Sequence, residues 1–167
     1  MRHYERRLPH WDTVAQPLFV TFRLHGSLPA HRVFAPKTLA LSGRAFVAMG
    51  RLLDRSASGP VHLRRKEIAE LVIQALQDGQ HKFQRYQLHS FVVMPNHVHL
   101  LVTPKVMASR WLANEFLASH GQAFWQDESY DHRVRSPAEF DRIRVERSKP
   151  PERRLRPGLA APHFVTR

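Results

Sequence analysis

Apolar and polar residues alternate along three stretches of the chain, and this pattern predicts β-strands. The first is LFVTFRL at 18–24, which is rich in β-branched and aromatic residues and precedes the turn sequence GSLP. The other two are RYQLHSFVVM at 85–94 and HVHLLVT at 97–103. Only Pro95 and Asn96 separate them, so these two strands are expected to form a hairpin with a tight turn.

Apolar residues at intervals of three and four, the spacing of one helix face, predict helices elsewhere. These stretches cover 35–55, 66–79, 109–121 and 137–146. The clearest stripe is that of 66–79, and Gly79 is expected to end this helix as its C-cap. Ser136 and Pro137 supply an N-cap and a first-turn proline for the last helix. Residues 123–136 are expected to form a loop, and the proline-rich end of the chain cannot continue the last helix.

The order of these elements predicts an α+β fold in which helices pack mainly on one face of an antiparallel sheet. A chain of 167 residues without internal repeats is expected to form one domain. No stretch reaches the roughly 18 uninterrupted apolar residues of a membrane helix, and the start MRHYERRLPHW has no apolar segment typical of a secretory signal. Cysteine is absent, which excludes disulfides and thiolate metal sites. We therefore expect a cytoplasmic protein with no membrane partner.

Basic residues outnumber acidic ones by far. The chain has 26 Lys and Arg against 14 Asp and Glu, a net charge of +12. Half of this surplus lies from Arg133 to the end, where ten Lys and Arg accompany four Asp and Glu. A genome that favours Arg over Lys explains the choice of Arg but not the shortage of acids. The charge therefore favours a polyanionic partner, of which nucleic acid is the commonest.

Two histidines, His97 and His99, stand one residue apart within the apolar run FVVMPNHVHLLVTP at 91–104. Residues i and i+2 of a strand project to the same face, about 6 to 7 Å apart, while Val98 points into the opposite layer. Two imidazoles in this arrangement can converge on one cation, including Mn²⁺ or Mg²⁺ when water or phosphate oxygens complete the shell. On spacing alone, a pair of hydrogen-bonded or exposed histidines remains an alternative.

The context of this pair resembles a known family. PNHVHLLVTP, preceded by FVVM, is similar to the histidine–hydrophobic–histidine motif of the HUH single-strand endonucleases and, within them, of the REP-associated tyrosine transposases. RRLPHW at 6–11, LFVTFRLHGSLP at 18–29 and FWQDESYDH at 124–132 resemble further segments of this group in the same order. The resemblance implies a ferredoxin-like antiparallel sheet, the HUH transposase fold, over 1–144. A divergent basic, proline-rich tail follows at 145–167, which in relatives belongs to the same single domain.

The resemblance also implies a chemistry. His97 and His99 carry over as ligands of Mg²⁺ or Mn²⁺, which polarises a scissile phosphate in single-stranded DNA. A tyrosine on a C-terminal helix attacks that phosphorus and forms a 5′-phosphotyrosine link, so that strands are cleaved and rejoined in DNA transposition and recombination. The expected partner is a REP element, a palindromic DNA hairpin with a short single-stranded guide.

The sequence departs from this family at the nucleophile. Relatives have a helix of the form Tyr-Ile-Glu-x-Asn-Pro-Val, in which the Asn is a further metal ligand. Here Glu146 occupies the tyrosine position and Pro150 the Asn position, and no tyrosine follows Tyr130. Tyr130 is a weak alternative nucleophile, because the family retains a tyrosine in this loop beside the true one. The resemblance therefore implies a DNA-binding protein of the transposase family whose cleavage chemistry is impaired.

The sequence leaves more than one function open and indicates which residues would contact DNA. The chain is either this impaired enzyme or a non-catalytic DNA-binding remnant; a metal hydrolase with a water nucleophile ranks last, because no carboxylate ligand stands near the histidines in the sequence. Monomer and homodimer both remain open. We expect phosphate contacts from arginines and base stacking by one aromatic residue. These DNA-binding residues are Arg133, Arg135, Arg142, Arg144 and Trp125.

Overall fold

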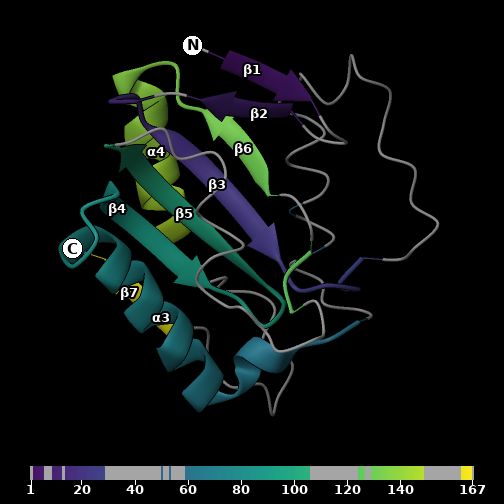
Figure 1. Cartoon of the computed structure of the whole chain (residues 1–167). Coiled ribbons are helices and arrows are strands. Elements are labelled where there is room, and N and C mark those ends of the chain that lie inside the picture. The colour runs from purple at the N-terminus through teal and green to yellow at the C-terminus, as the bar shows by residue number, and fades with distance from the viewer. Residues whose placement is uncertain are drawn as a thin grey trace.

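The computed structural model describes 2–5, 9–12, 14–28, 50, 53, 59–105, 124–126, 129–148 and 163–166. Its main feature is a five-stranded antiparallel sheet with the strand order β6-β3-β5-β4-β7 (Figure 1). The strands are β3 (Leu18–Arg23), β4 (Tyr86–Val93), β5 (His97–Pro104), β6 (Tyr130–Arg133) and β7 (His163–Thr166). A separate two-stranded sheet pairs β1 (Arg2–Glu5) with β2 (Pro9–Asp12).

Helices cover both faces of the large sheet. The helix α3 (Lys66–His81) follows a 3-10 turn, η1 (His62–Arg64), and lies in front of the sheet in Figure 1, whereas α4 (Pro137–Ser148) lies behind it. The α+β class with an antiparallel sheet is thus confirmed. The placement of helices mainly on one face is amended, because of the two long helices in the described ranges each covers a different face.

The alternation of side chains along β3 and β5 separates two apolar layers. Val20, Phe22 and Leu100 point toward α3 and form the main core with Val72 and Leu76 of that helix. The residues between them point the other way. On that side a smaller cluster holds the buried Phe19, Leu101 and Val134, against which Phe140 and Ile143 of α4 pack. Each strand therefore stabilises both layers, and the second layer is the one that the histidines share.

The predicted hairpin is confirmed, with β4 and β5 paired from Tyr86 opposite Pro104 to Val93 opposite Val98. The N-cap of α4 is confirmed as well, since the backbone N–H of Glu139 donates to Ser136 Oγ at 3.2 Å. The helices expected over 35–55 and 109–121 fall largely outside the described residues, apart from helical positions at 50 and 53. No helix in the described part of the chain is long and apolar enough to cross a membrane.

Two local predictions are wrong. Gly79 does not end its helix but lies buried within α3, which continues to His81. A glycine is needed there because a Cβ would come within 2.6 Å of Tyr86 Cζ, and the Tyr86 hydroxyl donates to the Leu76 carbonyl at 2.8 Å. The segment 123–136, expected to be a loop, contains the strand β6. This strand forms because it pairs with β3, and its short polar sequence alone does not predict it.

Candidate functional site

The site begins at the tight turn of the β4–β5 hairpin. His97 is the first residue of β5 and His99 the third, while Val98 between them is fully buried in the main core. Both imidazoles therefore lie on the other face of the sheet, the face on which α4 packs. His99 pairs with Thr21 and His97 with Arg23 across β3. The structure thus places both histidines on one face, as the strand spacing predicts.

The two imidazoles are in direct contact. His97 Nε2 and His99 Nε2 are 2.9 Å apart, and the rings meet edge to face with 4.5 Å between their centroids. His97 is 0% exposed and His99 1%. This arrangement corresponds to the hydrogen-bonded histidines of the alternative reading, and it also brings two potential ligand nitrogens to one point. A phosphate can reach this point only when the atoms above the rings are displaced.

A hydrogen-bonded partner orients each ring through its other nitrogen. Asn96 Oδ1 lies 2.7 Å from His97 Nδ1, and the Asn96 amide nitrogen donates to the Leu53 carbonyl at 3.2 Å. Because an amide oxygen only accepts, this contact assigns the proton of His97 to Nδ1 and leaves Nε2 as the acceptor nitrogen. Since His97 Nε2 accepts, the contact between the rings makes His99 Nε2 the donor, and the Thr21 hydroxyl donates to His99 Nδ1 at 2.7 Å. A cation bound at His99 Nε2 would require the other tautomer, in which Thr21 Oγ1 accepts from Nδ1–H.

The 2.9 Å between the two Nε2 atoms is the length of a hydrogen bond between the rings. Both nitrogens therefore lie close enough to reach one bound cation. In the described ranges no three His, Cys, Asp or Glu residues gather into a metal site, so water or phosphate oxygens would provide the remaining ligands. The described residues thus offer two imidazole nitrogens at this point, and the identity of a bound cation stays a prediction.

Sequence reasoning missed Arg23, which stands directly opposite His97 in the register of β3 and β5. Its guanidinium is partly buried, and burial lowers its pKa. Its Nη1 donates to Ser27 Oγ at 3.4 Å, at the turn that follows β3. A signal was available, because Arg23 shares the strand periodicity of Phe19 and Thr21 and so belongs to an inward face.

Tyr130 lies in the same cross-strand row as His99, because Thr21 pairs with both of them. It is 6% exposed and packs with Leu53 in a small apolar cluster. Burial, together with the neighbouring Asp131 carboxylate, raises the pKa of its phenol. A nucleophile needs an environment that favours the anion. Tyr130 therefore remains a neutral phenol, which is unfavourable for attack on a phosphate.

The helix α4 packs on the face of the sheet that carries the histidines. Phe140 and Ile143 pack toward Phe19, and Phe19 stacks on His99 with 5.4 Å between the ring centroids. Glu146, which occupies the tyrosine position of the resembled family, lies within α4. Pro150 lies outside the described residues.

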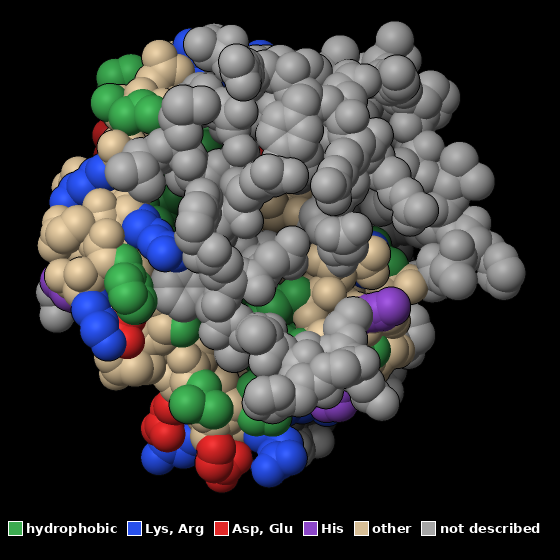
Figure 2. Space-filling model, in the orientation of Figure 1, with side chains coloured by type: hydrophobic (Ala, Val, Ile, Leu, Met, Phe, Trp, Pro, Cys, Tyr) green, Lys and Arg blue, Asp and Glu red, His purple; other side chains and the backbone are tan. Residues whose placement is uncertain are grey.

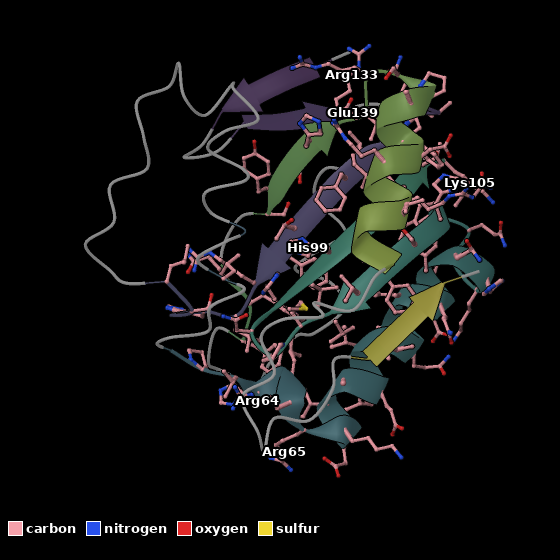
Figure 3. All side chains as sticks on the ribbon, turned by 180° about the vertical axis from the view of Figure 1, so that it is seen from behind. Arg64, Arg65, His99, Lys105, Arg133 and Glu139 are labelled. Carbon is pink, nitrogen blue, oxygen red and sulfur yellow. The ribbon has the colours of Figure 1, made fainter. Side chains whose placement is uncertain are left out.

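The expected arginines lie on β6, on α4 and, for Arg135, on the segment between them. Arg135, Arg142 and Arg144 are exposed, and Arg133 is partly buried at the upper end of α4 in Figure 3. Arg142 Nη2 lies 3.8 Å from Glu139 Oε1 and Arg144 Nη2 lies 3.4 Å from Asp141 Oδ1. Exposed ion pairs of this kind contribute little, so these side chains can exchange their partners for phosphates.

Glu139 links β6 to the start of α4. Its carboxylate accepts from the Arg135 backbone N–H at 2.7 Å and lies 3.0 Å from His132 Nε2. Burial alone would raise its pKa, but these hydrogen bonds and the charges of His132 and Arg142 outweigh it, so the pKa is lowered. The carboxylate is therefore ionised at neutral pH and joins His132 and the Arg135 backbone to the first turn of α4.

Trp125, expected to stack on a DNA base, lies in the main core, and its role in DNA binding stays a prediction. Its ring is 6% exposed and packs edge to face on Phe22 in the main core, with 4.5 Å between the ring centroids. It also forms an isolated bridge with Leu24. Trp125 belongs to the packing of the sheet, on the face opposite the histidines.

Comparison with known proteins gives one result. No family model matches the chain, and no curated protein matches it. Among solved structures, the chain is similar to a REP-associated tyrosine transposase bound to a REP hairpin, with 18% sequence identity and a TM-score of 0.42. The match covers 86% of this chain and 68% of that one.

Proposed function

We propose that this protein binds single-stranded or hairpin DNA and holds Mg²⁺ or Mn²⁺ at His97 and His99. One observation carries the proposal: two buried imidazoles whose Nε2 atoms lie 2.9 Å apart, each oriented through Nδ1 by a polar partner. Support comes from the net charge of +12 and from the sequence motifs that resemble the REP-associated transposases. The arginines of β6 and α4 supply phosphate contacts next to this face.

In this proposal each residue has a defined part. Asn96 and Thr21 fix the rings, and His97 and His99 present their Nε2 atoms toward a common point. A divalent ion bound there supplies Lewis-acid polarisation of a DNA phosphate. Cleavage and joining of strands, the chemistry that the resemblance implies, is impaired, because Glu146 is at the nucleophile position and Tyr130 is a buried phenol of raised pKa.

A second candidate, a DNA-binding protein without catalysis, is favoured by the same two residues. A carboxylate is a poor substitute for a phenolate in attack on a phosphodiester, and a neutral buried phenol is no better placed. The two candidates share DNA and metal binding and differ in one product, the covalent protein–DNA adduct.

The experiment uses the full chain, a labelled hairpin with a single-stranded flank, and Mn²⁺. We expect the protein to bind the labelled hairpin with an affinity that falls steeply as the salt concentration rises, because binding neutralises several phosphates. We expect Mn²⁺ affinity to fall at least tenfold in His97→Gln. The matched control is His89→Gln, since His89 sits on β4 and bonds Thr103 instead of the pair. Circular dichroism checks the fold of each variant.

Each part of the proposal has its own contrary outcome. A hairpin affinity that does not change with salt concentration argues against DNA binding through phosphates. Equal Mn²⁺ affinity in the two histidine variants argues against the metal site. An adduct that survives denaturation and disappears in Tyr130→Phe would show that cleavage is intact and would reject the non-catalytic candidate. No adduct is the expected result for that candidate.

A further inference from the structure

Arg23 carries a positive charge that is partly withdrawn from water beside the histidine pair. It is the last residue of β3, and its Cα partner on β5 is His97. Directly paired residues of antiparallel strands project to the same face with Cβ atoms about 5 Å apart. The side chain of Arg23 therefore starts next to that of His97, on the face that carries Thr21 and His99.

The partners of Arg23 differ from those of other basic residues. Arg65, Lys66, Arg142 and Arg144 each have a carboxylate oxygen within 4.0 Å. In the described part of the chain, the side-chain partner of Arg23 is instead the neutral hydroxyl of Ser27, at 3.4 Å. Withdrawing a guanidinium from water is unfavourable unless an anion or good acceptors replace the water. A long hydrogen bond to one hydroxyl replaces little of it.

Backbone hydrogen bonds on both sides of Arg23 fix its position at the end of β3. The Leu24 N–H donates to the Asn96 carbonyl at 2.9 Å, and the Gln126 N–H donates to the Arg23 carbonyl at 2.8 Å. Asn96 is also the residue that orients His97. Arg23 and the histidine pair are thus fixed relative to one another through the same turn.

We propose that Arg23 binds a phosphate oxygen of the DNA strand that lies against the histidine pair. This inference rests on the proposed function and names a further residue of its site. A guanidinium offers a planar fork of donors that matches two phosphate oxygens. Arg23 approaches the phosphate from the β3 side, while the Nε2 atoms of His97 and His99 lie on the β5 side. Arg23 is a positioning residue that fixes which phosphate of the strand meets the pair.

The test compares Arg23→Gln with Arg65→Gln, which removes the same charge at the start of α3 on the opposite face. Basic and acidic side chains lie together at that lower end of the molecule (Figure 2), and Arg64 and Arg65 lie well away from His99 in Figure 3. The probe is a short single-stranded oligonucleotide with Mn²⁺ at several salt concentrations. Arg23→Gln is expected to weaken binding about ten- to hundredfold. Its slope of log K against log [salt] is expected to be smaller by about 0.7.

Two further measurements separate this role from a general defect. Mn²⁺ binding without DNA is expected to be unchanged in Arg23→Gln, because the histidines and their partners remain. Arg23→Lys keeps the charge without the fork and is expected to recover part of the affinity and the full salt slope. If Arg23→Gln fails to fold, Arg23→Lys decides, and an affinity equal to that of the wild type would overturn the role of the fork.

The outcomes also separate this inference from the proposed function. If the wild type binds DNA and Mn²⁺ and Arg23→Gln binds DNA with the same affinity and salt slope, the Arg23 inference is wrong and the proposed function stands. An equal loss in Arg65→Gln also overturns it, because the effect is then one of net charge. If the wild type binds no DNA at any salt concentration, the proposed function fails and the inference fails with it.

Discussion

Thr21→Val tests whether the orientation of His99 matters for metal binding. Thr21 is 3% exposed, and its hydroxyl lies 2.7 Å from His99 Nδ1. Valine has nearly the shape of threonine, so the substitution removes this hydrogen bond while it keeps the packing of the strand. At 3% exposure, bulk water cannot easily replace the lost hydroxyl.

The magnitude follows from the part that Thr21 plays. Loss of a partner that orients a metal-ligating histidine typically lowers metal affinity 10- to 100-fold, or about 1.4–2.7 kcal/mol of binding free energy. Loss of one neutral buried hydrogen bond costs about 1 kcal/mol of the free energy of unfolding. We therefore expect a variant that folds but binds Mn²⁺ much more weakly than the wild type.

Titration calorimetry with Mn²⁺ on the DNA-free protein measures the effect directly. The chain contains a matched control, because Thr103 Oγ1 lies 2.7 Å from His89 Nε2 in a similar contact away from the pair. Thr103→Val is expected to bind Mn²⁺ within about twofold of the wild type, since it touches no residue of the pair. Wild-type affinity in a folded Thr21→Val, or equal losses in both variants, would refute this account of the site.

Two other predictions concern stability. Gly79→Ala is expected to destabilise the fold by about 2–4 kcal/mol in urea unfolding, because the new Cβ would displace the buried Tyr86 ring and its hydrogen bond. If the same substitution destabilises the Tyr86→Phe variant by as much, the hydroxyl has no part in this effect. Glu139 has a pKa lowered below 4.5, so its ionised form stabilises the folded chain above that pH, and the stabilisation is lost as pH falls through the folded value. Glu139→Gln is expected to cost about 1 kcal/mol at pH 7 and almost nothing at acid pH; an equal cost at both would contradict this.

The regular elements could be predicted where the pattern of one segment decides its structure. The alternation of 18–24 and the apolar run around His97 indicated strands whose faces are those observed, and the stripe of 66–79 indicated α3. The convergence of the two histidines follows from the same periodicity, because positions i and i+2 share a face. Such inferences need no knowledge of distant residues.

Features that depend on a distant partner could not be predicted. The sequence pattern predicts Gly79 as a helix C-cap. The glycine is needed instead because the ring of Tyr86, seven residues later, fills the space beside it. β6 exists because β3 offers it an edge, and Trp125 is buried because Phe22 lies against it. The periodicity of β3 places Arg23 on the same face as Phe19 and Thr21, but only the register with β5 places it beside His97.

The strand β7 extends the sheet next to β4. β7 pairs with β4 from Ser90 opposite Thr166 to Val93 opposite His163. Without it, β4 would be an edge strand with unpaired N–H and C=O groups along an apolar segment, which is the template for strand addition by a second molecule. A chain shortened before 163 would therefore be prone to aggregate even if every residue of the histidine site were intact. With β7 in place, this apolar segment of β4 is paired, and the four residues of β7 form the edge of the sheet instead.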